Sequence, residues 1–200
     1  NICQTYQAKN QQYFIVNKLR GTSAFNFVWG NQNLLVAVTG SSLPEKTINF
    51  HFRNWWIRHK IYNNAKIVTT KQINARQICS HVNIPCYDNL LGSNIFFNIR
   101  GISVVICTDD CFDKLNNSMK FKVDYLIITH ALKPQINRLS TYFNADMMVI
   151  DSSVDYYTAK KWVEQCRQAD INYWNINESG AFVVDLNNKK ERNNTLKIKY

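Results

Sequence analysis

The sequence predicts an α/β fold, with α+β as the alternative, in which β-strands form the core and helices pack outside them. Three continuously apolar segments have the character of central strands: Ile102–Cys107, Leu126–Ile128 and Met147–Ile150. Segments with helical character lie between the last two strands and again after Asp155. Strands with helices between them favour a layered arrangement of sheet and helix.

The N-terminal third is predicted to be an antiparallel meander. Polar, glycine-containing segments separate its three short apolar runs. The apolar runs are Phe14–Val16, Phe25–Val28 and Leu34–Val38. The segment Lys46–Arg58 then alternates in the manner of a long strand, with Ile48, Phe50 and Phe52 on one face. Residues 74–81 have the character of one or two helical turns.

Size and composition favour one soluble globular domain over residues 1–200, with a polar C-terminal tail over residues 187–200. The 200 residues are 46% hydrophobic and 19% charged, which is ordinary for a folded domain with one core. The sequence contains no internal repeat and no run of about 18 to 20 apolar residues that could span a bilayer. Because it starts at Asn1 without Met or a signal peptide, we expect a piece of a longer protein.

The charge balance points to a polyanionic partner. Lys and Arg number 24 against 14 Asp and Glu, which gives a net charge of +10. Such an excess attracts polyanions through long-range steering and counterion release. The positive charge is scattered rather than arranged in blocks, so the alternative is a basic domain that binds no polyanion.

One cluster interleaves cations with adjacent indoles. Proteins that bind single-stranded nucleic acid use this mixture for phosphate contact and base stacking. It predicts a weak, sequence-independent DNA surface made by Arg53, Trp55, Trp56, Arg58 and Lys60. The alternative is an edge strand that places one Trp in the core while the other caps the sheet.

A buried-strand pattern ends in Thr129–His130 without the rest of a metal site. A catalytic metal needs several converging His and Asp side chains, whereas residues 131–135 are Ala, Leu, Lys, Pro and Gln. We therefore predict no catalytic residue, no bound metal and no small-molecule cofactor. Weak candidates for recruitment as metal ligands are Asp109, Asp110, His130 and Asp151. For the acidic candidates the alternative is the capping of a following helix.

The cysteines do not indicate a structural metal site. They form no C-x-x-C pair, and buried thiols are the simplest interpretation. The six are Cys3, Cys79, Cys86, Cys107, Cys111 and Cys166.

The order of motifs from Val123 to Leu186 resembles the C-terminal domain of ComEC-type competence proteins. A strand ending in Thr129–His130 is followed by a helix-like run at Gln135–Phe143. Three short motifs then follow in order, "IDSS" at 150–153, "KKWVEQC" at 160–166 and "GAFVVDL" at 180–186. The opening hairpins resemble that domain more loosely.

This resemblance implies a metallo-β-lactamase-like arrangement of strands with outer helices. It implies the degenerate form without metal ligands that is common among ComEC relatives of Bacteroidetes-type bacteria. The parent protein would be tethered in the inner membrane, with the domain on the periplasmic side, where a Cys79–Cys86 disulfide is permitted. The implied partners are DNA and the transmembrane channel part of the same parent chain.

Residues and resemblance together predict a non-catalytic domain of a DNA-uptake channel protein that contacts DNA or the channel. Two alternatives stay open. One is a metal-dependent nuclease of the metallo-β-lactamase superfamily, with ligands recruited from the four weak candidates. The other is a purely structural module that docks on the channel. The number of metal ligands separates the first alternative from the prediction, and salt-dependent DNA binding separates the second.

Overall fold

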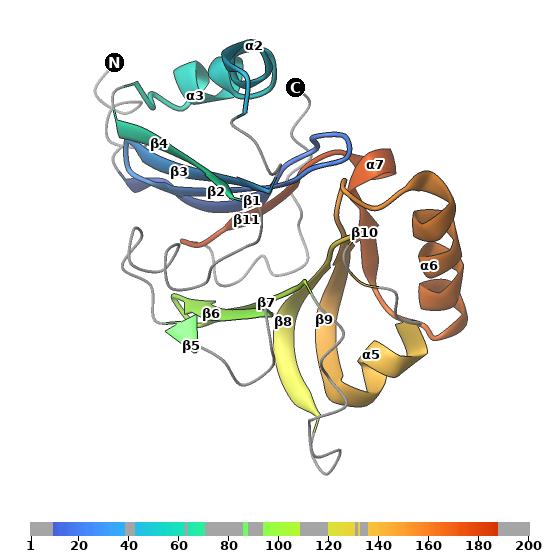
Figure 1. Cartoon of the computed structure of the whole chain (residues 1–200). Coiled ribbons are helices and arrows are strands. Elements are labelled where there is room, and N and C mark those ends of the chain that lie inside the picture. The colour runs from blue at the N-terminus through green and yellow to red at the C-terminus, as the bar shows by residue number, and fades with distance from the viewer. Residues whose placement is uncertain are drawn as a thin grey trace. The chain divides into compact units, whose positions relative to one another are not determined.

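The computed structural model describes residues 10–38, 43–62, 64–70, 86–87, 94–108, 120–130, 132 and 136–187, with the backbone alone for 64–70 and 86–87. The chain divides into two compact units. Unit 1 is Asn1–Gln72 with Gly180–Tyr200, and unit 2 is Ile73–Ser179. Each unit has its own β-sheet (Figure 1). Since compact units can be lobes of one domain, the single domain over residues 1–200 stays a prediction.

Unit 1 is built on a five-stranded sheet in the order β11-β1-β2-β3-β4. The predicted antiparallel meander is confirmed by the pairing of successive strands β1 (Gln12–Val16), β2 (Ser23–Trp29) and β3 (Gln32–Val38). β11 (Phe182–Asp185) pairs antiparallel with β1, and β4 (Asn64–Thr70) pairs parallel with β3. The tight turn between β2 and β3 uses Gly30, whose φ of 58° lies in the left-handed region that glycine adopts without a Cβ clash.

The segment after β3 is helical, so the prediction of a long strand over Lys46–Arg58 is wrong. It forms three consecutive elements, α2 (Glu45–Ile48), the π-helical turn η1 (Asn49–Arg53) and α3 (Asn54–Arg58). A period of two and a helical period both place residues i and i+4 on one face, so Ile48 and Phe52 fit either pattern. Phe50 distinguishes the two patterns. A strand would bury it beside its neighbours, whereas its side chain is 79% exposed.

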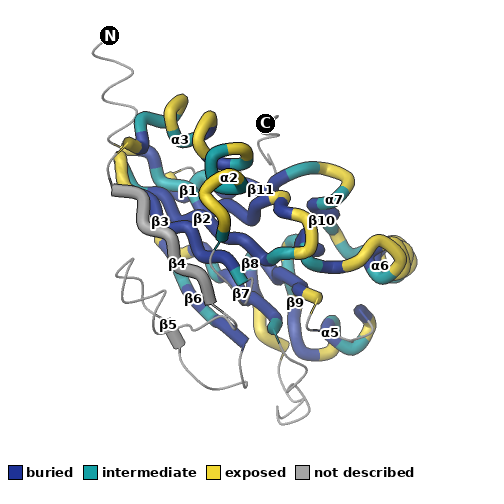
Figure 2. The backbone as a smooth tube through the Cα atoms, turned by 45° about the horizontal axis from the view of Figure 1, so that its top comes forward, coloured by how far each residue is buried: buried dark blue, intermediate teal, exposed yellow. Residues whose placement is uncertain are grey.

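The helical segment packs on one face of the unit 1 sheet (Figure 1). Trp55 and Ile61 belong to one buried cluster with Ile15, Val28, Ala181 and Val183. Phe52 belongs to a second cluster with Leu19, Ala24 and Leu35. Figure 2 shows the resulting pattern, in which buried strands lie under helices that are exposed on their outer side.

Unit 2 is built on a six-stranded sheet in the order β10-β9-β8-β7-β6-β5. β7 (Ile102–Cys107), β8 (Phe121–Ile128) and β9 (Phe143–Ile150) are parallel neighbours. This confirms that the three predicted central strands lie side by side in one sheet. β10 (Tyr173–Asn175) extends the parallel part beyond β9. On the other side β6 (Ile95–Ile99) and β5 (Cys86–Tyr87) continue in antiparallel pairing.

Among the described helices of unit 2, the longest covers the sheet as predicted. This helix is α6 (Tyr156–Gln168), and α5 (Ile136–Tyr142) and α7 (Ile176–Ser179) lie before and after it in the chain. α6 buries a stripe at helical spacing in the core that also contains Leu126 and Met148, and the stripe is Ala159, Trp162, Val163 and Cys166. Asp155 caps the helix, because its carboxylate accepts the N–H of Thr158 at 3.0 Å.

These two sheets with their helices confirm the predicted α/β or α+β class. The metallo-β-lactamase-like arrangement stays a prediction. Cys107 and Cys166 are buried thiols, as expected. Residues 74–81, Cys79, Cys111 and the tail after Asn187 lie outside the described residues. Within the described ranges, no helix is both long enough and apolar enough to cross a membrane.

Candidate functional site

The carboxyl ends of the parallel strands in unit 2 hold two of the four candidate metal ligands, His130 and Asp151. Parallel strands end at one edge of the sheet, where α/β folds gather functional groups. The loop after β8 is tied to β7, because the Thr129 hydroxyl donates to the Cys107 carbonyl at 2.9 Å. The loop after β9 is tied to β8, because the Asp151 N–H donates to the Ile128 carbonyl at 3.0 Å.

Ser153 joins these two loops through its hydroxyl. The hydroxyl donates to one carboxylate oxygen of Asp151 at 2.7 Å and accepts the backbone N–H of His130 at 3.1 Å. The other carboxylate oxygen of Asp151 accepts the N–H of Ser152 at 2.7 Å. Asp151 is completely buried, so these internal donors replace the water that a carboxylate would otherwise bind.

This network gives Asp151 a role in loop structure. Both carboxylate oxygens of Asp151 accept hydrogen bonds within the chain. His130 is exposed and joins the network through its main-chain N–H. The capping of α6, which was the alternative for Asp151, falls to Asp155. Among the described residues there is no group of three or more His, Cys, Asp or Glu side chains that could hold a metal ion. Asp109 and Asp110 lie outside those residues.

The predicted DNA-binding residues lie on η1, α3 and the turn that follows, and Trp55 faces the core of unit 1. Its side chain is 7% exposed. The indole stacks on the His59 ring with centroids 4.0 Å apart and meets the Tyr13 ring edge-on at 6.3 Å. Burial lowers the pKa of His59, and the nearby charge of Arg58 lowers it further. The hydrogen bond between His59 and the Trp55 carbonyl acts in the opposite direction. The lowered pKa favours the neutral form of the His59 imidazole.

Trp56 is half-buried and also takes part in packing. Its ring stacks on Phe52 with centroids 5.9 Å apart and an interplanar angle of 22°. The indole N–H groups of Trp55 and Trp56 are both buried, and neither has a hydrogen-bond acceptor within the described part of the chain. The polar edges of both indoles thus point into the protein.

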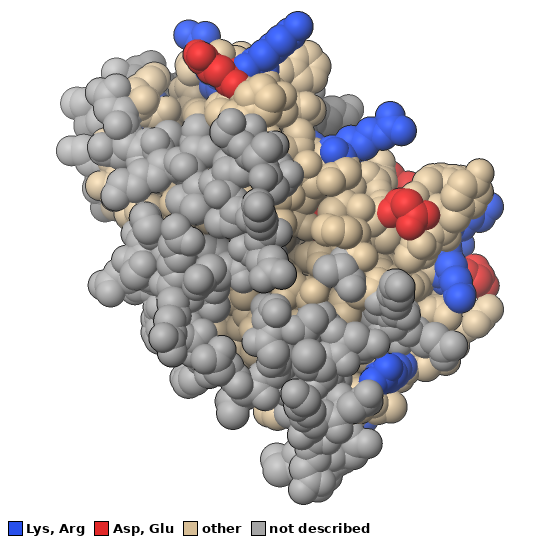
Figure 3. Space-filling view, viewed as in Figure 1, with Lys and Arg blue, Asp and Glu red and all other residues tan. Residues whose placement is uncertain are grey.

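The outer side of the same helical segment carries the basic strip, which we define as Lys46, Phe50, Arg53, Ile57 and Arg58. All five residues are exposed, and most of them follow one another at about one helical turn. Lysine and arginine side chains project from this segment at the top of Figure 3. The strip crosses the π-helical turn η1, a rare element that is frequent at functional sites.

Lys60 holds a special backbone position just after the basic strip. Its φ is 55°, and the N–H of Ile61 donates to the Trp56 carbonyl at 2.9 Å, which closes the end of α3 in a Schellman-type turn. Residues 45–60 then contain four cationic side chains, the three of the strip and Lys60, against the single carboxylate of Glu45.

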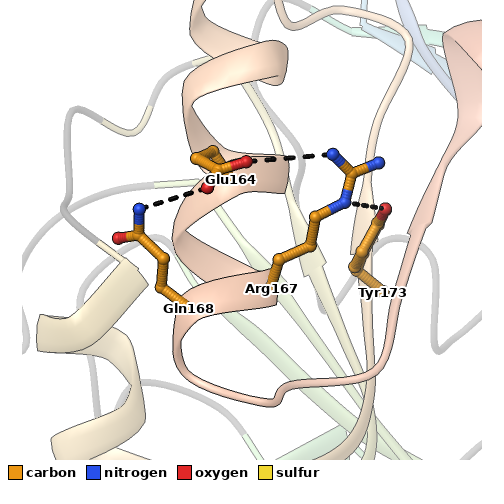
Figure 4. A network of polar contacts seen from close by, with 4 residues as sticks. All are labelled: Glu164, Arg167, Gln168 and Tyr173. Carbon is orange, nitrogen blue, oxygen red and sulfur yellow. Dashed lines mark hydrogen bonds and ion pairs between the residues drawn. The ribbon is translucent and has the colours of Figure 1, made fainter.

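A second polar surface lies on α6 in unit 2. Arg167 donates from Nε to the Tyr173 hydroxyl at 3.0 Å, and its Nη1 lies 3.8 Å from a Glu164 carboxylate oxygen (Figure 4). Gln168 donates to the other Glu164 oxygen at 3.2 Å. The side chains of the ion pair are about 60% exposed, so the pair adds little to stability. Together, Arg167 and Gln168 contact both carboxylate oxygens of Glu164.

A family model for the ComEC C-terminal domain matches residues 14–186. The chain belongs to this family. The match covers strands of both units, from β1 to β11, and it confirms the resemblance seen in the motif order. The family is that of competence proteins, which take part in DNA uptake. The Bacteroidetes-type origin and the loss of metal ligands stay predictions. Among curated proteins, no match was found.

Sequence reasoning missed Phe50 of the ComEC domain as a candidate site residue. The strand interpretation placed Phe50 on one face with Ile48 and Phe52, although Pro44 followed by Glu45 is typical of a helix start. It also missed the bridging role of Ser153, because a hydroxyl that joins two loops leaves no signal in local spacing.

Proposed function

We propose that this ComEC domain is a non-catalytic contact for DNA, and that the basic strip of unit 1 is its binding surface. The observation that carries the proposal is the exposed alternation of cationic and apolar side chains along one face of α2, η1 and α3. Membership in a DNA-uptake family supports DNA as the polyanion. The channel part of the parent chain is the second proposed partner.

Phosphate contacts would come from Lys46, Arg53 and Arg58, with Lys60 at the end of the helix. Arginine suits phosphate because its planar guanidinium presents several donors in a fixed geometry. The carboxylate in this region is that of Glu45, at the start of α2. Since these contacts address the backbone and not base edges, binding would be independent of sequence.

Base stacking would come from Phe50 rather than from the indoles. Trp55 is 7% exposed, and Trp56 is engaged with Phe52, whereas Phe50 is 79% exposed. An aromatic ring beside cations stacks on unpaired bases, and this favours single strands over duplex. The Trp residues would instead hold the helix that presents the strip.

The absence of catalysis is proposed from the residues around His130. Residues 131–135 supply no carboxylate and no imidazole. The Asp151 carboxylate is buried and bonded to Ser152 and Ser153. A hydrolytic metal near His130 would therefore need ligands from elsewhere in the chain.

Affinity for a labelled oligothymidylate at low salt tests the proposal. Arg53→Ala with Arg58→Ala should weaken binding markedly, and Phe50→Ala should weaken it for single strands more than for duplex. The matched control is Lys120→Ala with Lys122→Ala, which removes the same charge from exposed positions of unit 2. Equal losses in the strip variant and the control would show that only net charge matters, which contradicts a localised site.

A further inference from the structure

Two adjacent tyrosines at the beginning of α6 are unusually exposed. Tyr156 is 61% exposed and Tyr157 is 82% exposed. Their rings meet edge to face, with centroids 5.5 Å apart and an interplanar angle of 77°. Because the rings are nearly perpendicular, they present flat faces in two directions. Single exposed apolar residues are common, but a paired aromatic surface needs an explanation.

The packing of α6 does not explain why the two tyrosines are exposed. α6 is anchored by its inner stripe, of which Trp162 and Cys166 are members, and its first turn is capped by Asp155. Neither tyrosine belongs to the buried core of unit 2. Replacing both rings should therefore leave the helix and its packing in place.

A lysine follows each tyrosine by four residues, which is one helical turn. Lys160 and Lys161 are exposed, and neither forms an ion pair within the part of the chain that is described. Glu164, the next acidic residue along α6, is engaged by Arg167 and Gln168 (Figure 4). Asp155 lies at the same end of the helix, with its carboxylate bonded to the N–H of Thr158. Helical spacing thus places each lysine one turn along α6 from a tyrosine, on the same face of the helix.

We propose that Tyr156, Tyr157, Lys160 and Lys161 form a tyrosine platform that binds single-stranded nucleic acid. Stacking on the rings would hold unpaired bases, while the ammonium groups contact phosphates. The platform begins three residues after Ser153, at the edge where α/β folds bind ligands. It belongs to unit 2 and is independent of the basic strip in unit 1.

The composition of the platform favours a nucleic acid over a protein partner. Protein interfaces are enriched in tyrosine and arginine but depleted in lysine, whereas both cations here are lysines. Duplex DNA would offer phosphates but no free base faces to the rings. The platform should therefore respond to unpaired bases, which is a property that a purely electrostatic surface does not have.

The test compares an oligothymidylate with an abasic oligomer of the same length and charge, both bound at low salt. Tyr156→Ala with Tyr157→Ala should weaken binding of the oligothymidylate about fivefold or more, the equivalent of about 1 kcal/mol of stacking, with little effect on the abasic oligomer. Tyr156→Phe with Tyr157→Phe keeps the rings and should bind like the wild type. Lys160→Ala with Lys161→Ala should weaken both oligomers more than the control Lys120→Ala with Lys122→Ala does.

Each other outcome overturns the platform. Unchanged oligothymidylate binding in the double Ala variant would show that the rings do not stack on bases. An equal loss for both oligomers would show that the variant lost charge contacts or structure. If binding to vesicles of anionic lipid required the tyrosines while binding to the oligomers did not, the surface would be a membrane contact instead. The result does not depend on the basic strip, because the same comparison is made in the Arg53→Ala, Arg58→Ala background.

Discussion

Ser153 joins two loops at the carboxyl edge of the unit 2 sheet. Its hydroxyl connects the buried Asp151 carboxylate to the main chain at His130. Ser153→Ala removes one donor from a buried charge and the acceptor of a main-chain N–H. We expect it to lower the free energy of unfolding by about 1–3 kcal/mol in urea denaturation. Ser140→Ala, which removes an exposed hydroxyl bonded within its own helix, is the control and should change little. An equal, small effect of both changes would contradict the bridging role.

Asp155 makes the stability of α6 depend on pH. Hydrogen bonds from Thr158 hold the pKa of this carboxyl below its ordinary value of 3.8. A lowered folded pKa means that the contribution to stability is complete above pH 3.8 and is lost as the pH falls through the folded value. Thermal unfolding should thus show that Asp155→Ala is destabilising at neutral pH and that its difference from the wild type shrinks in acid. Asp155→Asn keeps a cap without a titrating charge, and its stability relative to Asp155→Ala should stay constant with pH. A difference that grows in acid would oppose this assignment.

The helical segment α2, η1 and α3 has an inner side that packs on the sheet and an outer side that is exposed. Trp55→Ala should lower the free energy of unfolding by about 3–5 kcal/mol, because it empties a buried site against the sheet. Phe50→Ala should change it by no more than about 0.5 kcal/mol, because that ring is exposed. Denaturant unfolding of the two variants decides between this arrangement and the predicted strand, on which Phe50 would be a core residue.

The cations of this segment should govern how DNA binding responds to salt. On single strands, the log–log slope of affinity against salt is about −0.7 per phosphate bound. Arg53→Ala with Arg58→Ala should make the slope shallower by about that amount for each phosphate that the variant no longer binds. Lys60 is left unchanged, because its φ of 55° couples it to the end of α3. A slope identical to that of the wild type would remove both arginines from the binding surface.

The same segment shows where pattern analysis stops. Ile48 and Phe52 satisfy a period of two as well as a helical period, and only the environment of Phe50 separates them. A π-helical turn adds a further shift that no simple periodicity describes. The cluster of cations and aromatic residues was visible in the sequence. Which aromatic side chain is exposed was not, because this depends on the helix and its packing.

For the whole molecule, continuous apolar strands were the most informative signal. The carboxyl-terminal parts of the parallel strands β7, β8 and β9 consist of consecutive buried residues, so these segments stand out in composition alone. The pairing of β1 with β11 joins residues more than 160 positions apart in sequence, as from Val16 to Phe182. Local patterns carry no information on such pairing, and the same holds for the division into two compact units.

We propose that this ComEC domain binds DNA without cutting it. The most direct measurement titrates an end-labelled oligothymidylate with the wild-type chain at low salt, with manganese or zinc present, and then recovers the strand on a denaturing gel. Saturable binding with an intact strand is the expected result. Metal-dependent cleavage that His130→Ala abolishes would instead establish the nuclease alternative, and a complete lack of binding would leave docking on the channel as the function of the domain.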